Sequence, residues 1–230
     1  MATANRNGEK GMTLLAVMGI MAVFAIGLLA VAPTVQQEVQ REKELEAIRR
    51  GEEVAEAIRQ YVEFYRGSKL PNSMDDLLEG LPQGTKKRQI LRASAAIDPL
   101  SEDGKWRLVK ADVNSLGGFA KRIQDYNGGL LPNNTSQVFD RWAIVIVNSL
   151  NTGTDEDLKG SDEDADDSTE NTPFIGVASR SKSVSVLSYY GIENHSKWVF
   201  TPLFRGTGSS NVRPSQPAQP AAPGDRITTQ

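Results

Sequence analysis

The chain opens with a polar leader that is followed by a long apolar run. From Met12 through Ala32 there is no charged residue, histidine, asparagine or glutamine. A helix of about 20 residues is about 30 Å long, which matches the hydrocarbon core of a bilayer. A single segment in lipid must satisfy its backbone groups internally and is therefore helical. The pattern predicts a leader over residues 1–11 and a membrane-spanning helix over residues 12–33.

The next segment, residues 34–66, changes to an amphipathic helical period. Its apolar residues recur at steps of three and four, and charged residues fill the remaining positions, so we expect one long helix that continues the apolar one. Gly51 lies on or beside the apolar stripe, where glycine costs about 1 kcal/mol relative to alanine. It either permits a close backbone approach or is merely tolerated. The stripe comprises Leu45, Ile48, Ala55, Ile58, Val62 and Tyr65.

Residues 67–205 alternate short apolar segments with polar turns, which predicts one modest α+β domain. Asn72 or Ser73 can cap a short helix with Asp75 and Asp76 in its first turn. A second short helix is predicted over residues 89–96. The strands should form a small antiparallel sheet on the apolar face of the long helix. They are predicted at Trp106–Val109, Trp142–Val147, Phe174–Ala178, Ser183–Leu187 and Lys197–Phe200.

The last segment, residues 206–230, is rich in proline, serine, glutamine, alanine and glycine and has little apolar bulk. Such a composition cannot bury enough surface to offset the entropy of ordering, so we expect a disordered tail. Its prolines are compatible with a polyproline II ligand, but no neighbouring basic or aromatic residue specifies a partner. These prolines are Pro214, Pro217, Pro220 and Pro223.

Charge and cysteine content narrow the range of functions. The 230-residue chain has a formal net charge of −3 and no cysteine. A slightly acidic chain has no electrostatic footprint for nucleic acid, and we expect no nucleic-acid partner. Without cysteine the domain depends on its apolar core rather than on disulfides, and thiol nucleophiles are excluded.

An acidic segment from Asp155 to Glu170 is the one candidate for metal binding. It begins like an EF-hand ligand series, but Asp167 stands where the turn glycine belongs and Pro173 replaces the bidentate glutamate. We therefore expect a solvated acidic loop and no cofactor, and a metal, if bound, would be Ca²⁺. The candidate ligands are Asp162, Asp164 and Asp166.

The sequence offers little for catalysis, and we expect no enzyme. His195 is the only histidine, and no Gly-x-Ser-x-Gly motif is present. His195 is expected at the surface or in a turn. The three tryptophans, Trp106, Trp142 and Trp198, are expected to anchor the core.

The junction Gly11-Met12-Thr13-Leu14-Leu15 resembles the prepilin-peptidase site of type IV pilins and type II secretion pseudopilins. Pro33 lies where many pilins have a helix-kinking proline. The resemblance implies a pilin-like α+β fold, cleavage between Gly11 and Met12, methylation of the new Met12 amine, and filament assembly through the apolar helix that contains Leu14 and Leu15. Weaker similarity to pseudopilin-like secretion proteins extends over residues 41–45, 70–78, 98–99, 106–109, 175–179 and 198–200.

The same resemblance implies partners and a location. The partners would be prepilin peptidase, other pilin or pseudopilin subunits and the inner-membrane assembly platform. The chain would be a single-pass protein of the bacterial inner membrane. Because Arg6 and Lys10 lie on the leader side, the N-terminus is expected in the cytoplasm and the domain in the periplasm.

One position departs from the pilin pattern. Most members of these families have a glutamate where this chain has Ala16. That carboxylate is thought to pair with the N-terminal amine of a neighbouring subunit, and an unpaired charge is costly in a dry helix bundle. Some minor pseudopilins that lack the glutamate are placed at the filament tip, so the resemblance implies a minor, tip-proximal subunit.

Other interpretations of the first 33 residues stay open. A plain signal anchor would remain uncleaved, and a secretory signal peptide could end at Ala30-Val31-Ala32, although Pro33 makes a poor peptidase site. At the level of function, the alternatives are a tip adhesin or substrate-binding module, and a membrane-anchored periplasmic protein that never assembles.

Overall fold

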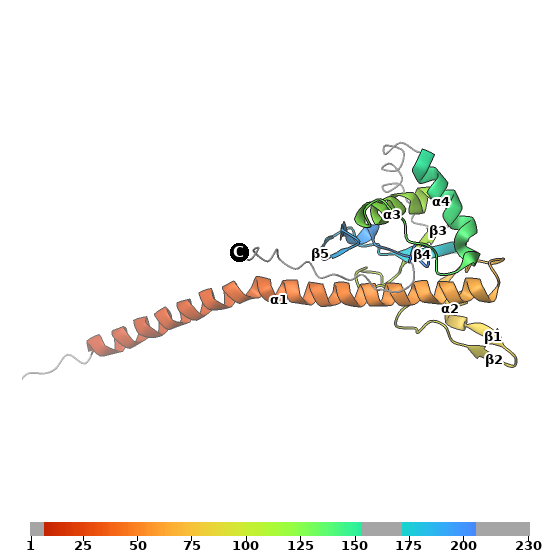
Figure 1. Ribbon diagram of the computed structural model, residues 1–230. Coiled ribbons are helices and arrows are strands. Elements are labelled where there is room, and N and C mark those ends of the chain that lie inside the picture. Colours follow the sequence, from red (N-terminus) through yellow and green to blue (C-terminus); the bar gives the residue numbers. More distant parts are fainter. Residues whose placement is uncertain (1–6, 153–171, 206–230) are drawn as a thin grey trace, which may run out of the picture. The chain divides into compact units, whose positions relative to one another are not determined.

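The computed structural model describes residues 7–152 and 172–205, and the side chains of residues 7–11, 28–35 and 151–152 lie outside what it describes. The chain divides into two compact units, Met1–Glu42 and Lys43–Gln230. Helix α1 (Asn7–Phe64) begins in the first unit and ends in the second (Figure 1). The predicted acidic loop and C-terminal tail lie outside the described residues.

In the second unit, the face of α1 that was predicted to be apolar forms one side of the core. The prediction is confirmed for most positions, but Leu45 is 41% exposed. The helix ends where Arg66 and Gly67 adopt positive φ and the Gly67 amide donates to the Val62 carbonyl at 2.9 Å. The buried residues on this part of α1 are Ala47, Ile48, Val54, Ala55, Ala57, Ile58, Tyr61 and Val62.

Gly51 allows a close approach between α1 and the sheet. A Cβ built on Gly51 would lie 2.3 Å from the Cγ atom of Phe200, far inside van der Waals contact. The Phe200 ring is fully buried. It packs edge-on against Trp106, with 5.7 Å between centroids, and in a tilted arrangement against Tyr189, with 5.2 Å between centroids. Of the two roles considered for Gly51, the structure therefore supports the close backbone approach.

Helix α2 (Met74–Glu79) has the predicted cap. The Ser73 side chain accepts from the Asp76 amide, and the Asp76 carboxylate accepts from the Ser73 amide, which makes a capping box. A short antiparallel hairpin follows, made of β1 (Leu81–Gln83) and β2 (Lys86–Arg88). Figure 1 shows this hairpin on the opposite side of α1 from α3 and α4.

The helix predicted over residues 89–96 is wrong. This segment forms turns, with Leu91 and Ala95 buried. The Gln89 side chain donates to the Leu91 carbonyl, and the Trp106 indole donates to the Ala95 carbonyl at 3.0 Å. The Leu91 carbonyl thus accepts from a side chain, and the Ala95 amide donates to the Arg92 carbonyl at 3.0 Å instead of making the hydrogen bond to Leu91 that a helix requires.

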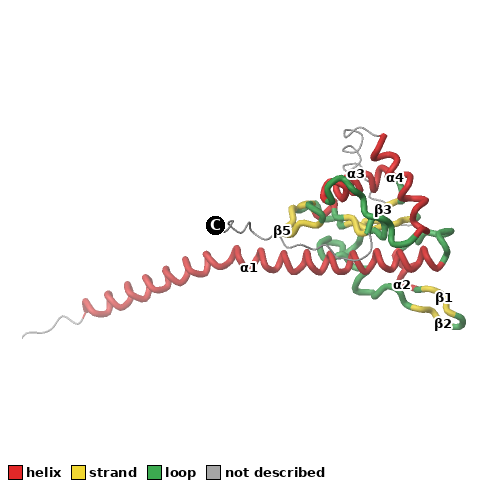
Figure 2. Tube along the Cα trace, viewed as in Figure 1, coloured by secondary structure: helices red, strands yellow, loops and turns green. Residues whose placement is uncertain are grey.

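Two small antiparallel sheets complete the domain (Figure 2). The first has the order β3 (Arg107–Lys110), β4 (Phe174–Ala178), β7 (Val199–Phe200), and every residue of the central β4 is buried. The second pairs β5 (Val184–Tyr189) with β6 (Ile192–Asn194), and a 3-10 turn, η3 (His195–Lys197), leads to β7. The strands predicted near 106–109, 174–178, 183–187 and 197–200 are confirmed, with shorter bounds in the last case.

The strand predicted at Trp142–Val147 is wrong. These residues belong to helix α4 (Asp140–Thr152), which follows the 3-10 turn η1 (Gln137–Phe139). Phe139, Ala143 and Ile146 are buried at a spacing of four and three, whereas Ile144 and Val145 are each 56% exposed. Packing of this helical stripe into the core overrides the β propensity of the Ile/Val run.

Helix α3 (Val113–Tyr126) was not predicted. It begins at Asp112, whose side chain accepts from the Ser115 amide at 2.7 Å. Two glycines and a serine weaken its intrinsic propensity, but it buries an apolar stripe against α4 and β3. That stripe comprises Leu116, Phe119, Ala120 and Ile123.

Of the tryptophans, Trp106 and Trp198 are buried as predicted, whereas Trp142 is only partly buried, with the Arg141 guanidinium 4.4 Å from its ring.

Candidate functional site

The first unit carries a continuous apolar surface on α1. Every large apolar side chain described between Met12 and Ile26 is more than half exposed, with Leu15 at 75% and Phe24 at 69%. A helix that is apolar all round is normally covered by lipid or by other helices. These residues are Met12, Leu14, Leu15, Val17, Met18, Ile20, Met21, Val23, Phe24 and Ile26.

Gly11, Met12, Ala16 and Pro33 all lie within α1, so the expected cleavage site and the proline named in the resemblance lie on one helix. Cleavage and methylation stay predictions. Within the described parts of the chain, no helix combines the length and the apolar character needed to cross a membrane. The expected segment, 12–33, extends into residues 28–35, whose side chains are not described.

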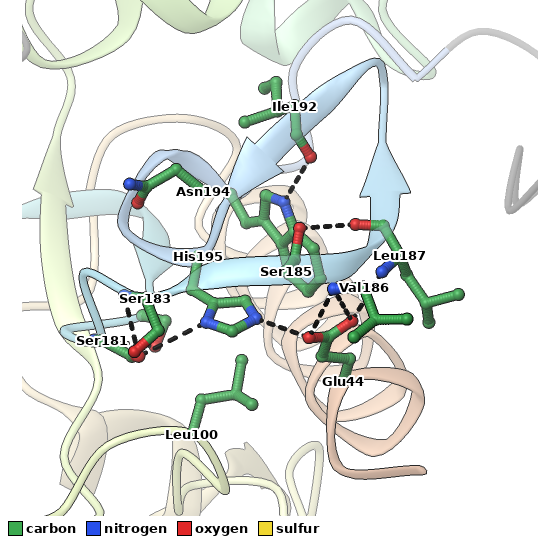
Figure 3. A network of polar contacts seen from close by, with 12 residues as sticks. Glu44, Leu100, Ser181, Ser183, Ser185, Val186, Leu187, Ile192, Asn194 and His195 are labelled. Atoms are coloured by element: carbon green, nitrogen blue, oxygen red, sulfur yellow. Dashed lines mark hydrogen bonds and ion pairs between the residues drawn. The ribbon is translucent and has the colours of Figure 1, made fainter. Parts of the chain in front are cut away.

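In the second unit, a buried carboxylate joins α1 to the β5–β6 sheet (Figure 3). Glu44 is fully buried, and its oxygens accept from the Val186 amide at 2.9 and 3.0 Å and from the Leu187 amide at 2.7 Å. The His195 ring nitrogen Nε2 lies 3.0 Å from the same carboxylate. With these three partners the buried Glu44 side chain has the hydrogen bonds that its oxygens need away from water.

The irregular ladder of β5 explains why this carboxylate is needed. Val184 pairs with Asn194 and Tyr189 with Ile192, so between these pairs β5 has residues 185–188 where β6 has only Glu193. Residues in such a bulge leave the ladder and lose their cross-strand partners. Glu44 accepts the amides of Val186 and Leu187 and so replaces the missing strand at this point.

His195 connects this junction to the loop before β5. Its Nδ1 atom lies 3.3 Å from the Ser181 hydroxyl, and its ring packs edge-on against Trp198 at 5.0 Å between centroids. Of the two positions expected for His195, the surface is wrong, because the residue is only 2% exposed, whereas the turn is confirmed, because His195 begins η3.

Ser181, His195 and Glu44 are the residue types of a hydrolase triad, in hydrogen-bond order. The imidazole and the carboxylate are closed off from solvent, and the Ser181 hydroxyl is also approached by the Ser183 amide at 3.4 Å. A substrate could not reach the imidazole without local opening. We therefore interpret the cluster as a structural junction.

Three further polar contacts lie in the second unit. The Tyr189 hydroxyl donates to Glu52 at 2.5 Å, and Arg205 pairs with the other Glu52 oxygen at 2.5 Å. Burial raises the pKa of Tyr189 well above its usual value, so the phenol remains a donor. Asp98 accepts from the Ser179 hydroxyl at 2.7 Å, and burial likewise raises the pKa of this carboxyl.

A surface cleft of about 590 Å³ lies between α4 and the loop after α3. Its lining combines aliphatic, aromatic and carboxamide side chains, including Leu130, Ile144, Phe204 and Asn133. No prediction from the sequence pointed to this cleft, because its walls belong to α3 and α4, one unpredicted and the other predicted as a strand.

The metal candidates Asp162, Asp164 and Asp166 lie outside the described residues. Among residues 7–152 and 172–205, no group of three or more histidine, cysteine, aspartate or glutamate side chains is arranged to hold a metal ion.

Glu44 is the residue that sequence reasoning missed. The signal was present, because Glu44 precedes Ile48 by one helical turn and so falls on the apolar stripe of α1. A carboxylate at that spacing indicates a buried acceptor. Its partners are 142 and 151 positions away in the chain, too far for any local pattern to identify.

Comparison of the chain with models of protein families, with curated proteins and with solved structures finds no match to any of them.

Proposed function

We propose that this chain is a pilin-like structural subunit, processed by prepilin peptidase between Gly11 and Met12 and assembled into a filament of the type II secretion or type IV pilus kind. The observation that carries the proposal is the row of exposed apolar side chains on α1 that starts directly after Gly11. Such a surface requires a cover, either lipid before assembly or neighbouring helices after it.

The second unit supports the proposal from its architecture. The part of α1 from Lys43 onward is built into a small α+β domain through its apolar face, through Gly51 and through the Glu44 junction. One helix thus supplies both an uncovered apolar segment and the central support of a polar domain. This division suits a subunit that assembles by its helix and presents its domain outward.

Ala16 supports a particular position in such a filament. Alanine cannot neutralise the amine of a neighbouring subunit in a bundle of low dielectric constant. A subunit with no neighbour above it has no such amine to neutralise. We therefore place the chain at or near the filament tip.

The experiment is the mass and N-terminal sequence of the protein purified from a membrane fraction, with and without Gly11→Leu. The unmodified chain should begin at Met12 with a methylated amine, and Gly11→Leu should accumulate as the uncleaved precursor. Ser68→Leu, a substitution outside the junction, serves as the control and should be processed normally. A mature protein that retains residues 1–11 would reject processing and favour a plain anchor.

A further inference from the structure

The cleft between α4 and the loop after α3 leaves apolar surface in contact with water. Leu130 is 76% exposed and Ile144 is 56% exposed, and both line the cleft. Its volume of about 590 Å³ lies in the range of pockets that bury a small ligand or a few residues of a peptide. A concave lining that combines apolar side chains with a few polar groups is the usual form of a ligand site.

The described chain ends at the wall of this cleft. Phe204 lines it, and the Phe204 amide donates to the side-chain oxygen of Asn134 at 3.2 Å. The Asn134 side-chain nitrogen in turn donates to Asp140 at 3.0 Å, which fixes the end of the chain to the first turn of α4. The described residues therefore end beside the cleft, and residues 206–230 continue the chain from there. A tether this short gives an effective concentration in the millimolar range or above.

The chemistry of that segment complements the cleft. Pro214, Pro217, Pro220 and Pro223 recur every third residue, and a polyproline II helix has three residues per turn, so this spacing would bring the four prolines to one face in that conformation. A polyproline II backbone has no internal hydrogen bonds, and its carbonyls need donors. The exposed carboxamides of Asn133 and Gln137 in the cleft can supply them.

Charged residues indicate in which orientation the C-terminal segment would bind. Arg213 directly precedes the first of these prolines, and Asp140 lies in the cleft wall. Pro214 is nine positions beyond Arg205, and nine extended residues span at most about 30 Å. We propose that the cleft binds the proline-rich C-terminal segment of its own chain, with the Pro214–Pro223 face against Leu130 and Ile144 and with Arg213 toward Asp140.

Docking of the segment can be tested by spin labelling of the full chain in detergent micelles. Because the chain has no cysteine, labels attach only at cysteines that are introduced. One label is placed at Ala218→Cys in the segment and the other at Thr135→Cys, an exposed position beside the cleft. The expected result is a narrow distribution of short distances between the labels. Pro217→Ser with Pro220→Ser should broaden it, because the apolar face is lost.

Helix α4 offers a matched pair of variants. Ile144 and Val145 are neighbours with equal exposure of 56%, but only Ile144 lines the cleft. Ile144→Asp should lower the ratio of docked to free segment about tenfold, whereas Val145→Asp should leave it unchanged. The proposal would be overturned if the distance distribution of the unmodified chain were as broad as that of the Pro217→Ser, Pro220→Ser chain. Equal effects of Ile144→Asp and Val145→Asp would also overturn it. Short distances that disappear when labelled chains are diluted with unlabelled ones would assign the cleft to the segment of a second copy and reject the intramolecular assignment.

Discussion

Removal of the Glu44 carboxylate tests the junction between α1 and the β5–β6 sheet. Glu44→Ala leaves the amides of Val186 and Leu187 and the Nε2 atom of His195 without the acceptor that they have in the structure. A buried donor that loses its partner costs about 1–3 kcal/mol. Three donors lose this acceptor together, so we expect Glu44→Ala to lower the free energy of unfolding by at least about 3 kcal/mol.

A conservative variant separates the acceptor from the charge. Glu44→Gln keeps the volume and one carbonyl oxygen, which can still accept from the two amides of β5. His195 can face the new amide group as an acceptor after a change of tautomer, with Nδ1 then donating to Ser181. We therefore expect Glu44→Gln to cost about 1–2 kcal/mol, clearly less than Glu44→Ala.

The assay is urea unfolding of the full chain in micelles, followed by tryptophan fluorescence, because Trp198 packs directly against His195. Glu42→Ala, the same substitution at an exposed position of α1, is the control and should change the free energy of unfolding by less than about 0.5 kcal/mol. A double-mutant cycle with His195→Ala should give a coupling energy of about 1–3 kcal/mol. The reasoning is refuted if Glu44→Ala costs no more than Glu42→Ala, or if the two single changes are additive.

Three further predictions concern other parts of the chain. Gly51→Ala should gain up to about 1 kcal/mol of helix propensity but lose more by forcing the buried Phe200 ring aside, so calorimetry should show a net loss of about 1–2 kcal/mol; a rise in melting temperature would contradict the close approach. Hydrogen bonds from Arg49 and then Arg50 lower the pKa of Glu46 to about 2, so its contribution to stability should be complete above about pH 4.5 and be lost as the pH falls toward 2. Glu46→Gln should flatten urea midpoints in that range, and an unchanged pH profile would exclude the ion pair as the cause. For Ala16, an antibody to the domain should label one end of assembled filaments, whereas label along the shaft would reject the tip position.

The parts of the fold that were predictable from the sequence are those with a local signal. The Ser73 cap, the apolar stripe of α1 and the buried run of β4 each follow from a few neighbouring residues, and the structure confirms them. The strand prediction for residues 142–147 failed because an Ile/Val run has the composition of a strand whichever structure it adopts. The helical spacing of its buried residues becomes apparent only when Phe139 is included with Ala143 and Ile146.

Only the α1 side of the junction could be predicted from the sequence. The position of Glu44 on an apolar stripe indicated a buried acceptor, but nothing local indicates that the amides of a strand bulge 142 positions later are the donors. The bulge exists because β5 and β6 differ in length between their pairs, a property of the tertiary arrangement. His195 was misjudged for the same reason, since its burial depends on Trp198 and on α1 together.

The distance along the chain between Glu44 and His195 has a consequence during synthesis. The two residues are separated by 151 positions, and a ribosome that adds about 5–20 residues per second needs about 8–30 s to cover them. For that time the apolar start of α1 has left the ribosome while the strands that complete the domain do not yet exist. For the function that we propose, recognition of the N-terminal helix at the membrane can therefore be complete before the domain has its last strand, β7 (Val199–Phe200).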